Sequence, residues 1–353
     1  RQMCIRDRRK SFKGTDMMRK TSKRRGTSVI AALVVLCAVL GYGLTEWKPL
    51  TDTPQAVPAS REAPGKGRVL EKISIPEKGE PVRLFTINAG NYFVPEDPRR
   101  SNFQVKYKPV EAREAVAELI RQSGAEIVGL SEMGGEAAVR DLQMRLKRKG
   151  VQLPHKVLVM RNGEDRGLAL LSKYPIVDNR SVTDMPVSGE TKRKKTMLRG
   201  ILDATVKTPD GRLFRLMGIH LKSRLSRDGS AEDTRRREAY ALRDYLNEAI
   251  ASQDGMPLLL YGDFNDGPAD SAVQVIQGPA KTEYRLNRLK PRDSRGETWT
   301  IYYEDGDTYH SFDHLFINNT LKKRLGRKPP MGILDSPPSR QASDHRGIWV
   351  ELR

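Results

Sequence analysis

The sequence contains only two cysteines and five histidines among its 353 residues. Two cysteines exclude a disulfide framework and a cysteine-rich zinc module, because such frameworks and modules use four or more. The chain has one long apolar run, which excludes a protein with many membrane spans. Aromatic residues make up 6% of the chain and apolar residues 37%, so the chain is still too apolar to be mostly disordered.

Positive charge is in excess, with 63 Lys and Arg against 44 Asp and Glu and a net charge of +19. Residues 1–26 hold eleven Lys or Arg and two Asp, residues 27–82 are balanced, and residues 83–353 carry +10. A basic balance favours polyanionic or anionic-surface partners, although ordinary solvated surface charge gives the same pattern.

The amino-terminal segment has the pattern of an export signal. Four basic residues between positions 20 and 25 precede residues 28–44, an uncharged and largely apolar run. This run is at the short edge of what crosses a hydrocarbon core, so we predict a signal anchor or a signal peptide. By the positive-inside rule the chain after Trp47 is expected outside the cytoplasm, membrane-anchored, or secreted or periplasmic if the signal is cleaved.

The remaining chain divides into a tail, a linker and one domain. Residues 1–26 form the basic tail, and we interpret residues 1–16 as upstream sequence that is not native, because Met17 or Met18 is a more natural start. Residues 45–81 are rich in proline and have no apolar periodicity, so they are predicted to be a linker. Residues 82–353 show no repeat and no further composition shift, which predicts a single domain.

Short apolar runs alternate with helical patterns in this domain. Strands are predicted at 83–88, 126–131, 156–160, 167–172, 200–206, 213–219, 257–261, 312–317 and 347–352. Helices are predicted at 110–122, 136–148 and 231–251, with a short one from Ala269. The middle of the domain runs from strand to strand with hairpin-length turns. This order favours an α/β (α+β) fold of two packed mixed β-sheets flanked by helices over a purely parallel sheet.

Polar residues that could carry chemistry lie at the ends of the predicted strands. They are Asn88, Glu132, His220, Asp263, Asn265, Asp313, Asp344 and His345. A side chain at a strand end is held rigidly and faces the opening at the sheet edge, a common place for a catalytic site. Each signal is weak alone, since a Glu after a strand is usually solvated and GDFND at 262–266 is also good turn chemistry. Their joint occurrence is what indicates a site.

The same residues lie in short motifs: TIN at 86–88, LSE at 130–132, LLSKYPI at 170–176, IHLKS at 219–223, GDFND at 262–266, DHLFI at 313–317 and SDH at 343–345. Together they resemble the endonuclease/exonuclease/phosphatase superfamily over about residues 83–352. The resemblance implies a DNase I-like four-layer sandwich, in agreement with the mixed order of elements. The chain departs from the pattern at Arg346 and Gly347, where many relatives have an apolar residue or a proline.

The resemblance implies a divalent metal, Mg²⁺ or Mn²⁺, held by Glu132 with Asn88 beside it and Asp344 as a further acidic group. Mg²⁺ prefers oxygen ligands and keeps several waters, so one or two carboxylates suffice. A metal on a phosphate oxygen supplies Lewis-acid stabilisation.

The resemblance also implies the catalytic residues. Asp263 and Asn265 would position and activate the attacking water. His345 would contact the scissile phosphate with Asp313 as its orienting partner, and His220 would lie opposite it across the phosphate. A carboxylate behind a histidine fixes its tautomer and holds it protonated.

Basic residues after the His220 strand could add phosphate contacts. Lys222 and Arg224 are the weaker candidates for this role, and Arg199 is a further one. The three other histidines are expected to take no part in the site.

We therefore expect an exported or membrane-anchored, metal-dependent phosphodiesterase, a monomer that acts on nucleic acid and contacts the membrane through residues 28–44. Sphingomyelinase-like and inositol-phosphate phosphoesterases share such a site and stay open as alternatives. A non-catalytic, membrane-tethered binding module would have a broken set of residues, and none is broken here. The sparse aromatics show no series on which the bases of a single strand could stack. The absence of HExxH, P-loop and GxSxG motifs disfavours zinc peptidases, nucleoside triphosphatases and ordinary serine hydrolases.

Overall fold

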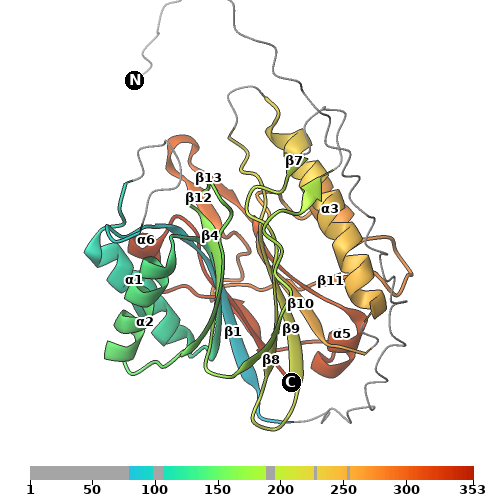
Figure 1. Ribbon diagram of the computed structural model, residues 1–353, viewed down its shortest axis with the longest axis horizontal. Helices are drawn as coiled ribbons and strands as arrows, with labels where there is room; N and C mark the ends of the chain where they lie inside the picture. Colours follow the sequence, from blue (N-terminus) through green and yellow to red (C-terminus); the bar gives the residue numbers. More distant parts are fainter. Residues whose placement is uncertain (1–78, 98–105, 188–194, 226–228, 253–254) are drawn as a thin grey trace, which may run out of the picture. The chain divides into compact units, whose positions relative to one another are not determined.

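The computed structural model describes residues 79–97, 106–187, 195–225, 229–252 and 255–353. In this part of the chain, two six-stranded sheets pack face to face, with helices on their outer sides (Figure 1). The predicted tail and signal segment, and nearly all of the linker, lie outside the described residues. No helix of the described part combines the length and the apolar content that crossing a bilayer requires.

The first sheet has the strand order β15–β16–β1–β2–β4–β3. Its strands are β1 (Val82–Tyr92), β2 (Ile127–Met133), β3 (His155–Val159), β4 (Gly167–Ser172), β15 (Met331–Ile333) and β16 (Ile348–Leu352). Strands β1 and β2 are parallel and joined through α1 (Val110–Ser123), whereas the other pairs are antiparallel. Helices α2 (Glu136–Arg148) and α6 (Ser339–Ala342) lie on the same side as α1 (Figure 1).

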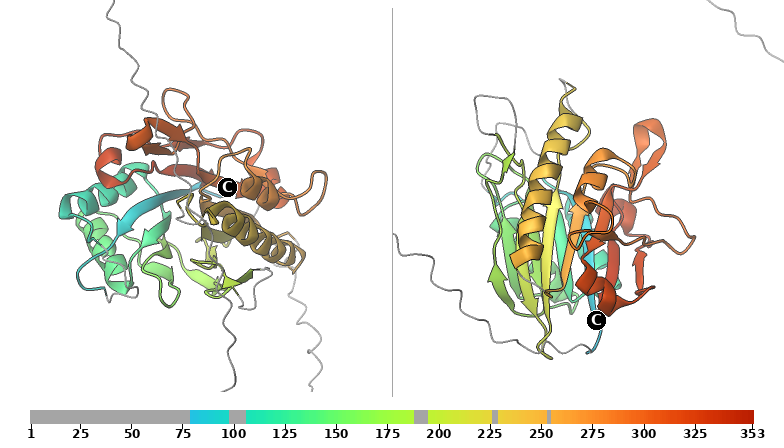
Figure 2. Two further views of the ribbon diagram at one scale, coloured as in Figure 1. Left: turned by 90° about the horizontal axis from the view of Figure 1, so that it is seen from above. Right: turned by 90° about the vertical axis from the view of Figure 1, so that its right-hand side faces the viewer.

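The second sheet has the order β11–β14–β10–β9–β8–β5. Its strands are β5 (Ile176–Asn179), β8 (Leu202–Lys207), β9 (Leu213–His220), β10 (Leu258–Asp263), β11 (Asn287–Arg288) and β14 (Asp313–Ile317). Its one parallel pair, β9 with β10, is joined through α3 (Ala231–Ser252), which runs along the outer face of the sheet (Figure 2). Helices α4 (Ser271–Gln277) and α5 (Asn319–Leu325) complete this side.

Two small ribbons stand apart from the main sheets. Strand β6 (Pro186–Val187) pairs with β7 (Lys195–Thr196), and β12 (Ile301–Tyr303) pairs with β13 (Thr308–His310) around a 3₁₀ turn at Glu304–Gly306. The fold class expected from the sequence, two packed mixed sheets flanked by helices, is confirmed. The short ribbons, β5, β11 and β15 are additions that the sequence pattern did not predict.

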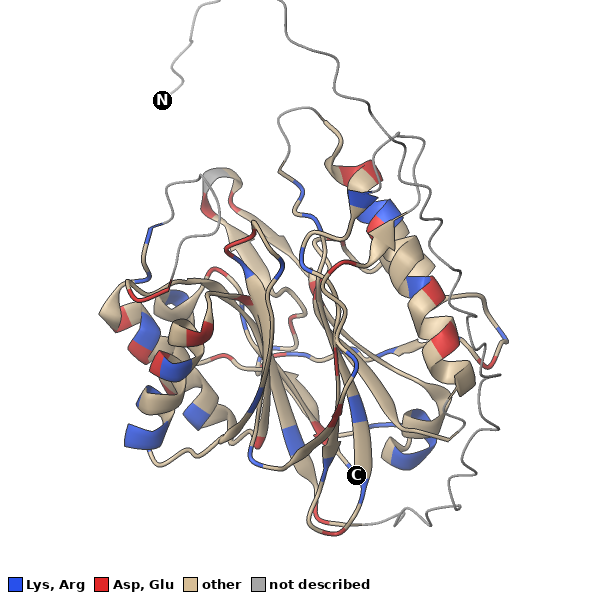
Figure 3. Cartoon of the chain, viewed as in Figure 1, with Lys and Arg blue, Asp and Glu red and all other residues tan. Residues whose placement is uncertain are grey.

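The largest core lies between the two sheets and includes Leu84, Leu216, Leu259 and Leu315. Two further apolar clusters lie on the outer faces, one under α1 and α2 and one under α3 and α4. Burial of these faces stabilises the helices, since a helix gains most of its stability from packing its apolar face. The outward faces of α1, α2 and α3 carry interspersed basic and acidic side chains (Figure 3).

The sheets approach each other most closely around Tyr261. A Cβ added to Gly129 would lie 2.1 Å from Cε2 of Tyr261, and one added to Gly218 would lie 2.8 Å from its hydroxyl oxygen. These two positions therefore need glycine, because backbone of both sheets lies against the buried ring. The parallel pairs β1–β2 and β9–β10 end at one edge of this packed core, and that edge carries the polar residues described next.

Candidate active site

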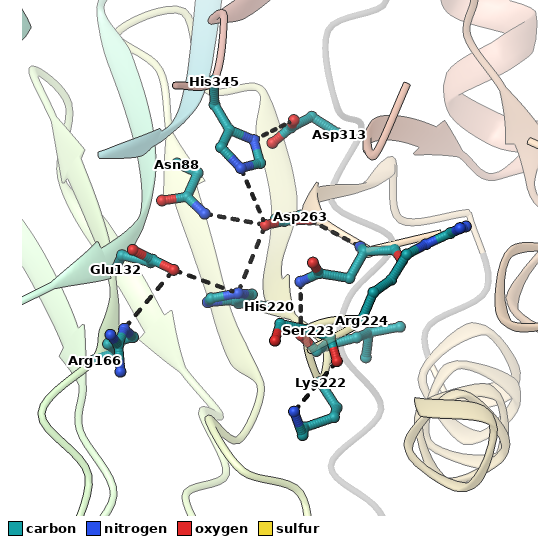
Figure 4. A network of polar contacts seen from close by, with 12 residues as sticks. Asn88, Glu132, Arg166, His220, Lys222, Ser223, Arg224, Asp263, Asp313 and His345 are labelled. Atoms are coloured by element: carbon teal, nitrogen blue, oxygen red, sulfur yellow. Dashed lines mark hydrogen bonds and ion pairs between the residues drawn. The ribbon is translucent and has the colours of Figure 1, made fainter. Parts of the chain in front are cut away.

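The structure brings the polar strand-end residues together at one edge of the two sheets. Those in direct contact with one another are Asn88, Glu132, His220, Asp263, Asn265, Asp313 and His345 (Figure 4). Asp344 lines one cavity together with Asn88, Glu132 and His345. The cavity has a volume of about 440 Å³ and a predominantly polar lining. Residues up to 257 positions apart in the chain thus share one site, as the sequence pattern predicted.

Asp263 is the centre of this cluster and is almost completely buried. Its Oδ2 accepts a hydrogen bond from Nδ2 of Asn88 at 3.0 Å, and its Oδ1 accepts one from the backbone N–H of Asn265 at 2.8 Å. The same Oδ2 lies 3.6 Å from Nε2 of His220 and 3.7 Å from Nε2 of His345. Burial raises the pKa of Asp263 well above its usual range, although His345 opposes the shift. Asp263 is therefore a carboxylate with an unusually high affinity for a proton.

His345 has the opposite electrostatic character. Its Nδ1–H donates to Oδ2 of Asp313 at 2.7 Å. Burial alone would lower the pKa of His345, but the carboxylates of Asp313 and Asp263 outweigh it and raise that pKa above its usual value. The loop is held in place by Ser343, whose hydroxyl donates to the carbonyl of Asn88 at 2.8 Å and accepts from the N–H of His345 at 3.1 Å. His345 is thus a rigidly placed imidazolium.

His220 is fully buried and close to two carboxylates, with Nε2 3.9 Å from Oε1 of Glu132 and 3.6 Å from Oδ2 of Asp263. Burial, reinforced by the positive charges of Arg199, His345, Arg166 and Lys222, lowers its pKa well below the usual value. Its Nδ1 has no hydrogen-bond partner among the described residues. His220 is therefore neutral at neutral pH, so the two histidines flanking Asp263 differ in charge.

Backbone bulges place Glu132 and Asn91 at the mouth of the cavity. Both have a positive φ, 56° for Glu132 and 51° for Asn91, and the registers of β1 with β2 and of β2 with β4 shift beside them. The N–H of Asn91 donates to Oε2 of Glu132 at 2.9 Å, and Nε of Arg166 donates to Oδ1 of Asn91 at 2.6 Å. A left-handed conformation of a non-glycine residue costs free energy, and such costs are typical of functional sites. Neither Asn91 nor Arg166 was identified from the sequence.

Lys108 is a further cavity residue that sequence reasoning missed. It is buried, and its Nζ donates to the carbonyl of Gly90 at 2.8 Å. Burial lowers the pKa of Lys108, and the negative charges of Asp344 and Glu132 oppose that shift. Lys108 therefore adds an amine beside the acidic residues. It follows a stretch of sequence without periodicity, and only its backbone bond to Phe93 brings it to the site.

The donor set fits a hard divalent cation. Within the described residues, no group of three or more His, Cys, Asp or Glu is close enough to hold a metal. Mg²⁺ and Mn²⁺ do not need such a group, because water can fill most of the coordination sphere. The carboxylate of Glu132, the amide oxygen of Asn88 and the carboxylate of Asp344 line the same polar cavity. All are oxygen donors, as Mg²⁺ requires, and no cysteine lies among them.

Lys222 and Arg224 have other partners. Nζ of Lys222 donates to the carbonyls of Ser223 and Leu225. Arg224 donates to the carbonyl of Asn265 at 3.0 Å and forms ion pairs with Asp266 and Asp270. These contacts fix the loop after Asp263, and phosphate binding by the two residues stays a prediction. His314 lies on the other face of β14, where its Nε2 pairs with the carbonyl of Asp266 at 2.9 Å.

A family model described as the Endonuclease/Exonuclease/phosphatase family matches residues 101–345. No curated protein matches the sequence.

Three of the similar solved structures show the range of this fold. The human nocturnin catalytic domain is 19% identical, with 77% of this chain and 94% of that chain covered and a TM-score of 0.51. Beta toxin from Staphylococcus aureus is 14% identical, with 77% and 100% covered and a TM-score of 0.53. Truncated TDP2 from Caenorhabditis elegans is 18% identical, with 78% and 98% covered and a TM-score of 0.51. At these identities the likeness concerns the fold.

Proposed function

Because the chain belongs to the endonuclease/exonuclease/phosphatase family, we propose that it is a metal-dependent phosphodiesterase that hydrolyses nucleic acid. The family implies hydrolysis of phosphate esters. The observation that carries the proposal is the buried Asp263 between a neutral His220 and a charged His345, beside a cavity of oxygen donors. The arrangement combines a base, a cation and a metal-binding cavity within one site.

Asp263 is the general base of this proposal. Its raised pKa gives it a high affinity for the proton of an attacking water, and a positioned base of this kind contributes about 10²–10⁴-fold to a rate. Asn88 and Asn265 hold its two oxygens by hydrogen bonds, which aims the carboxylate. The side chain of Asn265 itself donates to the carbonyl of Leu221 at 3.0 Å, so Asn265 acts by positioning Asp263 and the loop.

His345 and His220 are proposed to hold the phosphate from two sides. An imidazolium stabilises the negative charge that spreads over the phosphate oxygens in the transition state, and Asp313 keeps His345 in this form. Neutral His220 can donate one hydrogen bond to a phosphate oxygen without adding charge. Figure 4 shows the two rings on opposite sides of Asp263.

Glu132, Asn88 and Asp344 are the residues that would hold the metal. A bound Mg²⁺ or Mn²⁺ supplies Lewis-acid stabilisation of the phosphate. Lys108, which lines the same cavity, would add positive charge on the side away from His220.

Nucleic acid is favoured among the phosphodiesters by charge. The domain from residue 83 carries +10, and Lys108 and Arg340 line the catalytic cavity. A polyanionic backbone gains affinity from such residues. Sphingomyelin and inositol phosphates are the alternative substrates of the same chemistry. A non-catalytic module is disfavoured, because it has no need for a buried base placed between two histidines.

Export and membrane anchoring are proposed from residues 28–44 alone, together with the basic residues before them. Fractionation of cells that express the full chain tests this part separately. Recovery in the membrane or outside the cytoplasm is expected, and recovery only in the cytoplasm would refute it.

The proposed reaction is tested with the full chain and bis-p-nitrophenyl phosphate in the presence of Mg²⁺. Asp263→Asn and His345→Gln are expected to lose about 10²-fold or more in kcat. His155→Gln, a histidine at the start of β3 that does not line the cavity, is the matched control and is expected to keep full activity. Unchanged activity in both site variants would refute the assignment. Plasmid DNA, RNA, sphingomyelin and inositol phosphates assayed side by side then identify the substrate class.

A further inference from the structure

A second cavity opens beside the catalytic one, and its lining is aromatic. Its volume is about 1310 Å³, and Trp299, Tyr302, Tyr303 and Tyr309 line it. Three residues, Arg340, Ser343 and Asp344, line both this groove and the catalytic cavity. The groove is therefore continuous with the place where the phosphodiester is proposed to be cleaved.

The aromatic wall is built by the β12–β13 hairpin. Tyr302 and Tyr309 are directly opposite each other on the two strands, so their side chains lie on the same face of the hairpin. Their ring centroids are 4.8 Å apart, and Trp299 lies edge-on to Tyr309 at 4.9 Å. Tyr309 is 54% exposed, which is high for an aromatic residue beside a site. The sequence reading found no stacking series, and the structure corrects it, because hairpin closure brings these three rings together.

Hydrogen bonds tie this hairpin to the catalytic loop. Ile301 forms a β-bridge with His345, and the N–H of Arg346 donates to the carbonyl of Thr300 at 2.7 Å. The hydroxyl of Thr300 accepts from the N–H of Asp313 at 3.0 Å. The wall and the catalytic histidine are thus parts of one rigid unit.

Arg346, which departs from the sequence pattern of the superfamily, has its role here. Its guanidinium lies over the ring of Trp299, 3.4 Å from the centroid, and its Nη1 pairs with the buried carboxylate of Asp293 at 2.8 Å. It also donates to the carbonyl of Trp299 at 2.6 Å. Arg346 therefore fixes one face of Trp299 and holds the aromatic wall in place.

The charges of the groove indicate what can bind in it. Its lining holds three arginines, Arg295, Arg340 and Arg346, and four acidic residues, Glu297, Glu304, Asp335 and Asp344. Such a balance does not provide the excess positive charge that follows both backbones of a duplex. Carboxylates along the rim would also have to lose water against a lipid surface, which costs free energy. Ring faces beside a polar rim instead suit planar bases that carry N–H donors.

One cation lies at the junction of the two cavities. Arg340 is exposed, and within the described part of the chain it has no ion-pair partner. A guanidinium in this position can contact the phosphate that follows the scissile one. The other two arginines are engaged, Arg295 with Glu297 and Asp335, and Arg346 with Asp293.

We propose that this groove is a base-stacking subsite for single-stranded nucleic acid, in which Tyr302 and Tyr309 stack on a base next to the scissile phosphate and Arg340 contacts the adjoining phosphate. The inference rests on the proposed nuclease function and adds the strandedness of the substrate to it. A base must be unpaired to enter the groove, so single strands bind and react in preference to duplexes.

The test measures binding of the full chain to short fluorescent oligonucleotides by anisotropy, in EDTA to prevent hydrolysis. Tyr309→Ala is expected to weaken single-strand binding about tenfold, as the loss of one stacked base predicts. Tyr309→Phe keeps the ring and is expected to restore binding, whereas Tyr309→Leu is not. Tyr240→Ala is the matched control, because Tyr240 lies on α3, is also 54% exposed and lines neither cavity.

Oligonucleotides that each lack one base sharpen the test. One abasic position is expected to weaken binding to the natural chain about tenfold and to have no further effect on Tyr309→Ala, because both changes remove the same contact. Equal effects of every abasic position, or unchanged binding in Tyr309→Ala, would overturn the inference. Loss of vesicle binding in Tyr309→Ala with unchanged oligonucleotide binding would assign the hairpin to a lipid surface and also overturn it.

The two proposals fail in different ways. If the natural chain hydrolyses no nucleic acid in Mg²⁺, the proposed function fails. If it hydrolyses nucleic acid but Tyr309→Ala has the same KM for single strands and the same preference over duplexes, only the stacking subsite fails.

Discussion

Nδ1 of His345 lies 2.7 Å from Oδ2 of Asp313, while Nε2 on the other side of the same ring lies 3.7 Å from Oδ2 of Asp263. One carboxylate thus fixes the ring, and the other lies at its catalytic side. Both residues of the first pair are buried, which strengthens their interaction.

Asp313→Asn tests this relationship. An amide keeps the shape of the side chain but removes the charge that holds His345 as an imidazolium. We expect kcat for bis-p-nitrophenyl phosphate to fall about 10²-fold while KM changes little, since the loss concerns the transition state. Asp335→Asn, which changes an exposed aspartate at the rim of the groove, should leave kcat for this small substrate unchanged. A variant with full kcat would contradict the positioning role of Asp313.

Removal of the metal gives a second prediction. Millimolar Mg²⁺ is expected to raise the Tm of the natural chain, because a ligand that binds only the folded state stabilises it. Glu132→Gln should lose most of this increase, and EDTA should abolish both the increase and the activity. Glu136→Gln, on the first turn of α2, is the control and should respond to Mg²⁺ as the natural chain does. An equal increase in Glu132→Gln would place the metal elsewhere.

The packing of Tyr261 against Gly129 gives a prediction about stability. Gly129→Ala would place a Cβ 2.1 Å from the ring of Tyr261, so one of the sheets must move. We expect a loss of about 1–3 kcal/mol in the free energy of unfolding, measured by urea denaturation. Gly306→Ala, where the new Cβ would meet Thr308 at 3.6 Å, should change stability little. Tyr261→Leu combined with Gly129→Ala should recover part of the loss, and no recovery would show that the ring is not the cause.

His314 gives a pH dependence. Burial lowers the pKa of His314 to about 4, so the folded protein holds it neutral well below the usual value of 6.5. Because the folded-state pKa is the lower one, its contribution to stability is present above about pH 6.5 and is lost as the pH falls through about 4. The loss amounts to about 3 kcal/mol over that window.

Urea denaturation between pH 7 and pH 4 measures this loss. His314→Gln can keep the hydrogen bond to the carbonyl of Asp266 but cannot titrate, so its stability should fall less steeply. A variant with the same pH slope as the natural chain would assign the slope to other groups, such as buried His220.

Much of the site could be predicted from the sequence because its residues sit at strand ends. Asn88, Glu132, Asp263 and His345 each follow or adjoin an apolar run, and the ends of such runs meet at one edge of a sheet. Lys108, Asn91 and Arg166 could not be found in this way. Lys108 lies outside any periodic element, and Asn91 faces Glu132 only because both adopt a left-handed backbone at a bulge.

Apolar periodicity by itself determined the helices α1, α2 and α3, the strands of both sheets that bury a face, and the strand-end residues that they carry, because these depend on local spacing. Only the tertiary structure decided that Trp299, Tyr302 and Tyr309 form one surface beside the catalytic cavity. The same holds for the charge of the histidines, since it depends on burial and on carboxylates supplied by distant strands. Contacts between distant segments have no period in the sequence, so they exist only once the chain has packed.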